Sequence, residues 1–156
     1  MKQSISRETP LSEICLRRYE KPYNLNRRQL LRKLCLSIGL LQPGDSRDVV
    51  VDVFFVLLQS QKEMSSEEVK DAVIELRKDE DLPLHGIASS NIRRQLKRLR
   101  DLYFIEKVRN NYRVTENTTL SDIYKEKIES FMLPSIINRL KDYLKETDKA
   151  FKLDDA

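Results

Sequence analysis

The sequence predicts a mostly α-helical protein with one small β-hairpin. Apolar residues recur at helical spacing along most of the 156 positions, and the chain holds only three glycines. Two short runs of strand-forming residues, 104–108 and 112–115, flank Asn110 and Asn111, a residue pair that suits a hairpin turn. No stretch of about 18 consecutive apolar residues exists, so we expect no membrane-spanning helix.

Residues 27–38 are expected to form the first helix. Asn26 is a good N-cap residue, and Gly39 suits the left-handed backbone that often follows a helix. Residues 1–44 carry nine basic and three acidic residues, a net charge of +6. We interpret them as a basic N-terminal extension, which could add contacts to a polyanion or lie as a strap across the core.

The run VVVDVFFVLLQS is ambiguous, because β-branched residues also suit a buried strand. Asp48, Asp52 and Gln59 favour a helix over 47–59, because their spacings of four and seven would align them as one exposed stripe on an otherwise buried helix. Asp45 is spaced from Asp48 as in a capping box.

The next helix is expected to begin at a cap on Ser65 or Ser66. Glu67 and Glu68 would then lie in its first turn, where the helix dipole favours acidic groups. The helix should end before Pro83.

Residues 82–91 are expected to form a short extended segment that leads into a third helix, capped at Ser89 or Ser90 and ending near Leu102. The apolar residues of this helix recur at steps of four, three and three, and they are Ile92, Leu96, Leu99 and Leu102. At about 100° per residue, the opposite side is almost purely cationic. Its basic residues are Arg93, Arg94, Lys97, Arg98 and Arg100.

Residues 120–151 are expected to form a last helical region, with Thr119 as its cap. Pro134 should either kink this region or start a second helix. Its apolar residues keep heptad-like steps of three and four, which favours a homodimer. The expected dimerisation residues are Ile136, Ile137, Leu140, Tyr143 and Leu144. The same stripe could instead pack back on the rest of the chain.

The stretch ASSNIRRQLKRLRDL (88–102), followed by FIEK, a basic turn and YRV, resembles the recognition helix and wing of winged helix-turn-helix regulators of archaea and bacteria. This resemblance covers residues 45–115 and implies a DNA-binding fold. We therefore divide the chain into the N-terminal extension (1–44), a winged-helix domain (45–116) and a C-terminal helical region (117–156). The extension departs from the minimal winged-helix pattern.

The cationic helix has the size and the chemistry to enter a nucleic-acid groove. A helix about 10–12 Å across fits the major groove of B-DNA, which is about 12 Å wide. The expected nucleic-acid-binding residues are Ser89, Ser90, Asn91, Arg93, Arg94, Lys97, Arg98, Lys107, Arg109 and Arg113. Among them, Ser90, Asn91 and Arg94 are candidates for base edges, and the long cations Lys97, Arg98, Lys107, Arg109 and Arg113 are candidates for phosphates.

Charge is segregated along the chain. Residues 84–113 carry eight basic and two acidic residues, whereas residues 45–83 carry five basic and eleven acidic residues. This segregation favours a polyanion partner, although the basic and acidic segments could also pack on one another. The first hypothesis is a dimeric DNA-binding transcription regulator. The alternatives are an RNA- or ribosome-associated factor whose dimer bridges particles, and a protein-interaction module.

The sequence offers little for catalysis, so we expect neither an enzyme nor a cofactor or metal. His85 is the only histidine, and no glycine-rich phosphate loop or nucleophile elbow is found. Cys15 and Cys35 are too far apart for a metal or redox motif. The polar N-terminus lacks the apolar centre of a signal peptide, so a cytoplasmic location is expected.

Overall fold

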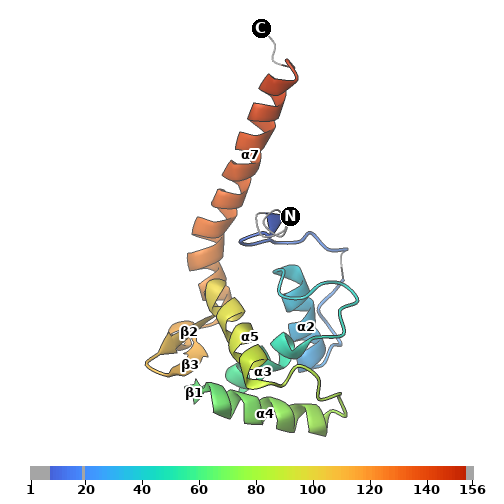
Figure 1. The fold of residues 1–156 in the computed structure, drawn as a ribbon, viewed down its shortest axis with the longest axis vertical. Coiled ribbons are helices and arrows are strands. Elements are labelled where there is room, and N and C mark those ends of the chain that lie inside the picture. The colour runs from blue at the N-terminus through green and yellow to red at the C-terminus, as the bar shows by residue number, and fades with distance from the viewer. Residues whose placement is uncertain (1–7, 19, 154–156) are drawn as a thin grey trace. The chain divides into compact units, whose positions relative to one another are not determined.

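The computed structural model describes residues 8–18 and 20–153, and its contacts divide the chain into one compact unit that ends at Thr118 and a second that begins at Thr119. The first unit combines long helices with a small sheet (Figure 1). Its elements in chain order are α2 (Arg27–Ser37), α3 (Val49–Ser60), β1 (Met64–Ser65), α4 (Ser66–Asp79), α5 (Ser89–Asp101), β2 (Ile105–Val108), β3 (Asn111–Val114) and the 3-10 helix η1 (Thr115–Asn117). The predicted mostly helical fold with a hairpin is confirmed.

Two predicted helix caps are confirmed. At the start of α2, the Gln29 amide donates to Asn26 Oδ1 at 2.8 Å, and the Asn26 amide donates to Gln29 Oε1 at 3.0 Å. At the start of α4, Ser65 and Glu68 exchange the same pair of bonds at 3.2 and 3.3 Å. Each reciprocal pair satisfies amide donors that a helix start leaves without intrahelical partners.

Two other cap predictions are wrong. Asp45 and Asp48 do not form a capping box: Asp45 accepts from the Arg47 amide at 2.9 Å, and Asp48 is itself the N-cap residue of α3. The Asp48 side chain makes no cap bond, because arginine side chains occupy its carboxylate. The N-cap of α5 is Ala88, so neither Ser89 nor Ser90 caps that helix. The Ser89 hydroxyl instead bonds to side chains of α4.

The sheet is antiparallel, with strand order β1-β3-β2. In its register, Met64 pairs with Tyr112 and Ile105 pairs with Val114. No strand forms within 82–91, the segment expected to be extended, and the third strand of the sheet is β1, directly before α4. A strand of two residues shows no sequence period, and its pairing with β3 alone defines it.

The hairpin turn lies one residue earlier than predicted. Arg109 and Asn110 form it, and Asn111 already belongs to β3. Arg109 adopts a positive φ of 60°, a conformation that residues other than glycine visit infrequently. The shift places a basic side chain at the tip of the hairpin.

Helix α3 is the centre of the core and packs against α2, α4 and α5 (Figure 1). The ring centroids of Phe54 and Phe104 lie 5.8 Å apart, so an aromatic pair joins α3 to the segment before β2. The predicted apolar side of α5 is confirmed, with Ile92, Leu96 and Leu99 fully buried. Burying each such side chain contributes about 1.5–3 kcal/mol.

The prediction of a helix at 47–59 is confirmed, but the exposed aspartate stripe that supported it is wrong. Asp52 is 0% exposed and Asp48 is 9% exposed, whereas Gln59 is at the surface. Both carboxylates face inward because arginine side chains from α2 and α4 neutralise them there. The first turns of α3 are therefore buried on their polar side as well.

The second unit contains α6 (Leu120–Ile123), the π-helical segment η2 (Tyr124–Met132) and α7 (Leu133–Ala150). The predicted cap is confirmed, since the Asp122 amide donates to Thr119 Oγ1 at 3.1 Å. Pro134 lies in the first turn of α7, where its missing amide hydrogen is tolerated. In the described part of the chain, no helix is both long and apolar enough to cross a membrane.

Candidate nucleic-acid interface

The outward side of α5 presents four long cations to solvent. Arg93, Arg94, Lys97 and Arg100 are all exposed, and they fall within an arc of roughly 120° at 100° per residue. In the described part of the chain, Arg93, Arg94 and Arg100 make no side-chain hydrogen bond or ion pair. Lys97 Nζ lies 3.2 Å from Asp101 Oδ2, with both side chains more than half exposed. A solvated pair of this kind is weak and leaves Lys97 available to a ligand.

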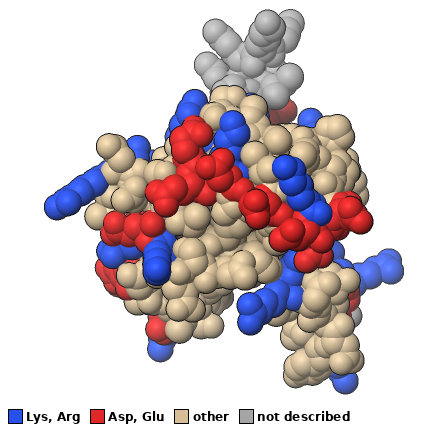
Figure 2. Space-filling model, turned by 90° about the horizontal axis from the view of Figure 1, so that it is seen from below, with Lys and Arg blue, Asp and Glu red and all other residues tan. Residues whose placement is uncertain are grey.

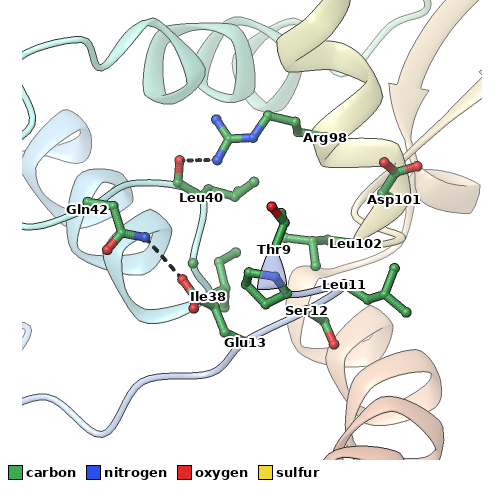
Figure 3. A pocket seen from close by; sticks show the side chains of 12 residues that line it. Thr9, Leu11, Ser12, Glu13, Ile38, Leu40, Gln42, Arg98, Asp101 and Leu102 are labelled. Carbon is green, nitrogen blue, oxygen red and sulfur yellow. Dashed lines mark hydrogen bonds between the residues drawn. The ribbon is translucent and has the colours of Figure 1, made fainter. Parts of the chain in front are cut away.

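Arg98 is held differently from its neighbours. Its Nη2 donates to the Leu40 carbonyl at 2.7 Å (Figure 3). Its Nη1 donates to Gln95 Oε1 at 2.8 Å. The half-buried side chain thus ties α5 to the segment that follows α2. We predicted a phosphate contact for Arg98, but in the structure both of its terminal nitrogens donate to groups within the protein.

The first turn of α5 is also occupied by internal contacts. Asn91 donates to the Gly86 carbonyl at 2.7 Å and accepts from Gln95 Nε2 at 3.0 Å. Ser89 Oγ accepts from Lys70 Nζ at 3.1 Å and donates to Glu67 Oε1 at 3.3 Å. Glu67 therefore brings a negative charge beside the turn that we expected to approach a polyanion. Ser90 remains exposed.

The hairpin contributes two accessible cations. Arg109 is exposed at the turn, and Lys107 is exposed with its Nζ 5.5 Å from the centre of the Tyr112 ring. This cation–π contact orients Lys107 without neutralising it. Arg113, in contrast, lies 2.8 Å from Glu106 Oε1 and 3.9 Å from Glu63 Oε1.

The Arg113–Glu106 pair is part of a small network at the base of the hairpin. Partial burial raises the pKa of Glu106, but bonds from the Glu116 amide and the Arg113 guanidinium outweigh it and hold the pKa below its ordinary value. Glu106 is therefore ionised at neutral pH and cancels the charge of Arg113. Arg113 therefore stabilises the hairpin through this ion pair and is less available to bind a ligand than Lys107 or Arg109.

Acidic side chains gather on α4. Figure 2 shows them as a band across the face that lies lowest in Figure 1, where α4 runs. Its exposed acidic residues are Glu67, Glu68, Asp71, Glu75 and Asp79. Glu67 reaches the first turn of α5 through its bond with Ser89. Within the described residues, this acidic face forms no ion pair with the cations on the outward arc of α5, so it does not neutralise them.

The basic and acidic segments do meet inside the protein, at a cluster that the sequence interpretation missed. Arg28 donates to Asp52 at 2.9 Å and to Asp48 at 3.0 Å, and Arg32 donates to Asp48 at 2.9 Å. Arg77 of α4 completes the cluster by contacting both aspartates, and its Nε donates to the Pro83 carbonyl at 2.7 Å. The cluster joins α2, α3 and α4.

A signal for this cluster exists in the sequence. Asp48 and Asp52 are four residues apart on an otherwise apolar helix, and Arg28 and Arg32 are four residues apart on the preceding one. Residues four apart share a helix face, so the two faces are complementary in charge. The prediction of an exposed aspartate stripe considers the aspartates without these arginines, which is why it is wrong.

The ten predicted nucleic-acid-binding residues therefore fall into two groups. The accessible ones are Ser90, Arg93, Arg94, Lys97, Lys107 and Arg109, and those held by internal contacts are Ser89, Asn91, Arg98 and Arg113. Arg100 is an accessible cation that we placed on the basic side of the helix but left out of the site. In the described part of the chain, no cluster of His, Cys, Asp or Glu side chains is arranged to hold a metal ion.

The predicted dimerisation residues lie on α7. Ile136 is half-buried, and the other four are exposed, with 46% of Ile137 and 66% of Tyr143 accessible. No protein-family model matches the chain, and no curated protein or solved structure matches it.

Proposed function

We propose that this chain is a winged-helix protein that binds nucleic acid through α5 and the β2–β3 turn. The element order supports the fold, since a helix, a short strand, two more helices and a hairpin follow one another in α3, β1, α4, α5, β2 and β3. Helices α4 and α5 would form the helix-turn-helix, with α5 as the second, recognition helix. The hairpin would be the wing.

The observation that carries the proposal is the set of accessible cations on α5. Arg93, Arg94 and Arg100 are exposed, and within the described residues their charges are not neutralised. Long cations without protein partners on one side of a helix suit the phosphates of a polyanion, because neutralising phosphates releases condensed counterions. Lys107 and Arg109 add charge on the hairpin.

The internal contacts at the start of α5 favour binding to phosphates over recognition of base edges. Ser89 and Asn91 already use their polar atoms within the protein, and Glu67 opposes a close phosphate there. This observation favours the second candidate function, an RNA- or ribosome-associated factor that recognises shape and backbone. A sequence-specific DNA regulator would depend on Arg94 and Ser90 for its base contacts.

Fluorescence anisotropy with a labelled DNA duplex and a labelled RNA hairpin tests the proposal. The triple variant Arg93→Ala, Arg94→Ala, Lys97→Ala should bind both more weakly. It should also lower the slope of log affinity against log salt by about one for each phosphate that is no longer bound. Lys78→Ala, which removes one exposed cation near the end of α4, is the control for the loss of a positive charge elsewhere on the surface. Equal binding by the triple variant and the wild type at low salt would refute the proposal.

Two further measurements separate the candidate functions. For a regulator, selection from a random DNA pool should yield one motif, and Arg94→Ala should relax the preference at a single base position. For a particle-associated factor, the selected pool should stay random and the protein should co-sediment with ribosomal subunits in a sucrose gradient.

A further inference from the structure

Helix α7 carries an exposed apolar stripe that runs along its length. The accessible fractions are 46% for Ile137, 58% for Leu140, 55% for Leu144 and 73% for Phe151, the residue that follows the helix. Such a row of large side chains in water is costly, at about 25 cal/mol for each Å² of apolar surface that a partner would cover. Covering the stripe with the apolar face of a partner would therefore be favourable.

The spacing of the stripe is that of a coiled-coil seam. Steps of three and four place Ile137, Leu144 and Phe151 at a positions and Leu133, Leu140 and Thr147 at d positions. The residues that flank the seam on one side, at g, are Ile136, Tyr143 and Ala150. Those on the other side, at e, include Lys141 and Asp148. One flank is thus free of charge, and the other carries one charge of each sign.

We propose that α7 pairs with α7 of a second copy of this chain, and that the two helices run in opposite directions. In this arrangement the e flank of one helix meets the e flank of the other, and the g flanks meet likewise. The seam layers would be Leu133 with Phe151, Ile137 with Thr147, and Leu140 with Leu144, each between copies. A two-fold axis near Asp142 would generate each of these layers twice.

The residues that flank the seam favour the antiparallel arrangement. Side chains lean toward the N-terminus of their own helix, so Lys141 of one copy and Asp148 of the other lean toward each other. The symmetry makes two such ion pairs. On the other flank, Tyr143 meets Tyr143 across the axis, and Ile136 meets Ala150.

In a parallel pair of α7 helices, the same flanking residues would form fewer favourable contacts. Its g flank would meet the e flank of the partner, which places Tyr143 beside Asp148 and Ile136 beside Lys141. No opposite charges would meet, and Thr147 would face Thr147 in the seam. Charge complementarity on α7 therefore favours the antiparallel pair.

Sedimentation equilibrium on the full chain, over a wide range of concentrations, tests the pairing. The helix has 18 residues, about two and a half heptads, so the wild type should show a reversible monomer–dimer equilibrium. Lys141→Asp and Asp148→Lys should each raise the dissociation constant about tenfold, because each replaces two attractive pairs by two repulsive ones. The double variant that exchanges the two charges should restore the wild-type value.

Matched controls keep the result specific. Lys145→Asp and Asp142→Lys make the same charge changes at exposed positions outside the seam and its flanks, and they should leave the equilibrium unchanged. Circular dichroism should show equal helix content in all these variants. A wild type that stays monomeric at the highest concentration would overturn the proposal, as would single charge reversals without effect on a dimer.

The direction of the helices has its own readout. In a Cys15→Ser background, Tyr143→Cys should form a disulfide between copies, because the two residues meet only in the antiparallel pair. A parallel pair would instead cross-link through Leu144→Cys, and that result would overturn the proposed direction. The dimer does not depend on nucleic-acid binding, so the anisotropy and sedimentation experiments can fail separately.

Discussion

Arg28 and Asp52 form an ion pair across 24 positions of the chain, with Arg28 Nε 2.9 Å from Asp52 Oδ1. Arg28 belongs to α2, and Asp52 lies in the buried core of the first unit. The pair makes the basic N-terminal segment part of the fold, because the same aspartate also contacts Arg77 of α4. Part of the charge of residues 1–44 is thus neutralised inside the protein.

Asp52→Asn should destabilise the first unit strongly. The substitution leaves the buried guanidinium of Arg77 with one charged partner fewer, and breaking a buried pair in this way costs about 3–5 kcal/mol. Urea denaturation followed by circular dichroism measures the loss. Asp71→Asn, on the exposed side of α4, is the control and should change stability by less than about 0.5 kcal/mol. Similar midpoints for the two variants would contradict the role of the cluster.

The stabilising effect of Asp48 should disappear in acid. Burial raises its pKa, but bonds and charges from Arg28 and Arg77 outweigh burial and hold the pKa below its ordinary value. A group with a lowered pKa in the folded state stabilises fully above its unfolded pKa, which is about 3.9, and loses this effect as the pH falls through the folded value. The difference in unfolding free energy between wild type and Asp48→Asn should therefore be constant near neutrality and shrink below about pH 4. A difference that grows in acid would contradict this assignment.

The two cysteines should differ sharply in reactivity. Burial raises the pKa of the Cys35 thiol to about 12, whereas Cys15 is exposed. Because the thiolate is the reactive form, iodoacetamide at pH 8 should label Cys15 alone in the native protein and both residues in urea. Mass spectrometry of the intact chain counts the labels. Rapid double labelling of the native protein would show that Cys35 is accessible.

Arg98 should contribute to stability, whereas Arg94 should not. Arg98→Ala leaves the Leu40 carbonyl without its donor, and an unsatisfied group of this kind costs about 1–3 kcal/mol. Arg94→Ala removes an exposed side chain, so its denaturation midpoint should match that of the wild type. Thermal denaturation of both variants compares them, and the opposite order would contradict the assignment of Arg98 as an internal tether.

Local patterns were sufficient to predict the helices. The N-caps Asn26 and Ser65 and the apolar steps of α5 depend on residues within a few positions of one another, and each was found as predicted. Strand β1 could not be predicted in the same way. Its two residues become a strand only by bonding to β3, which lies more than forty positions away.

The candidate site was predicted in outline, because the periodicity of α5 separates its apolar side from its cationic side. Helical periodicity alone places four cations on one arc of this helix. Which polar groups stay available depends on the packing of distant segments, since the contacts of Asn91 with Gly86 and of Arg98 with Leu40 form only where the chain folds back. The burial of Asp48 and Asp52 was decided in the same way. A carboxylate can leave water only where other segments bring charge to meet it, and here Arg28 and Arg77 do so from two separate helices.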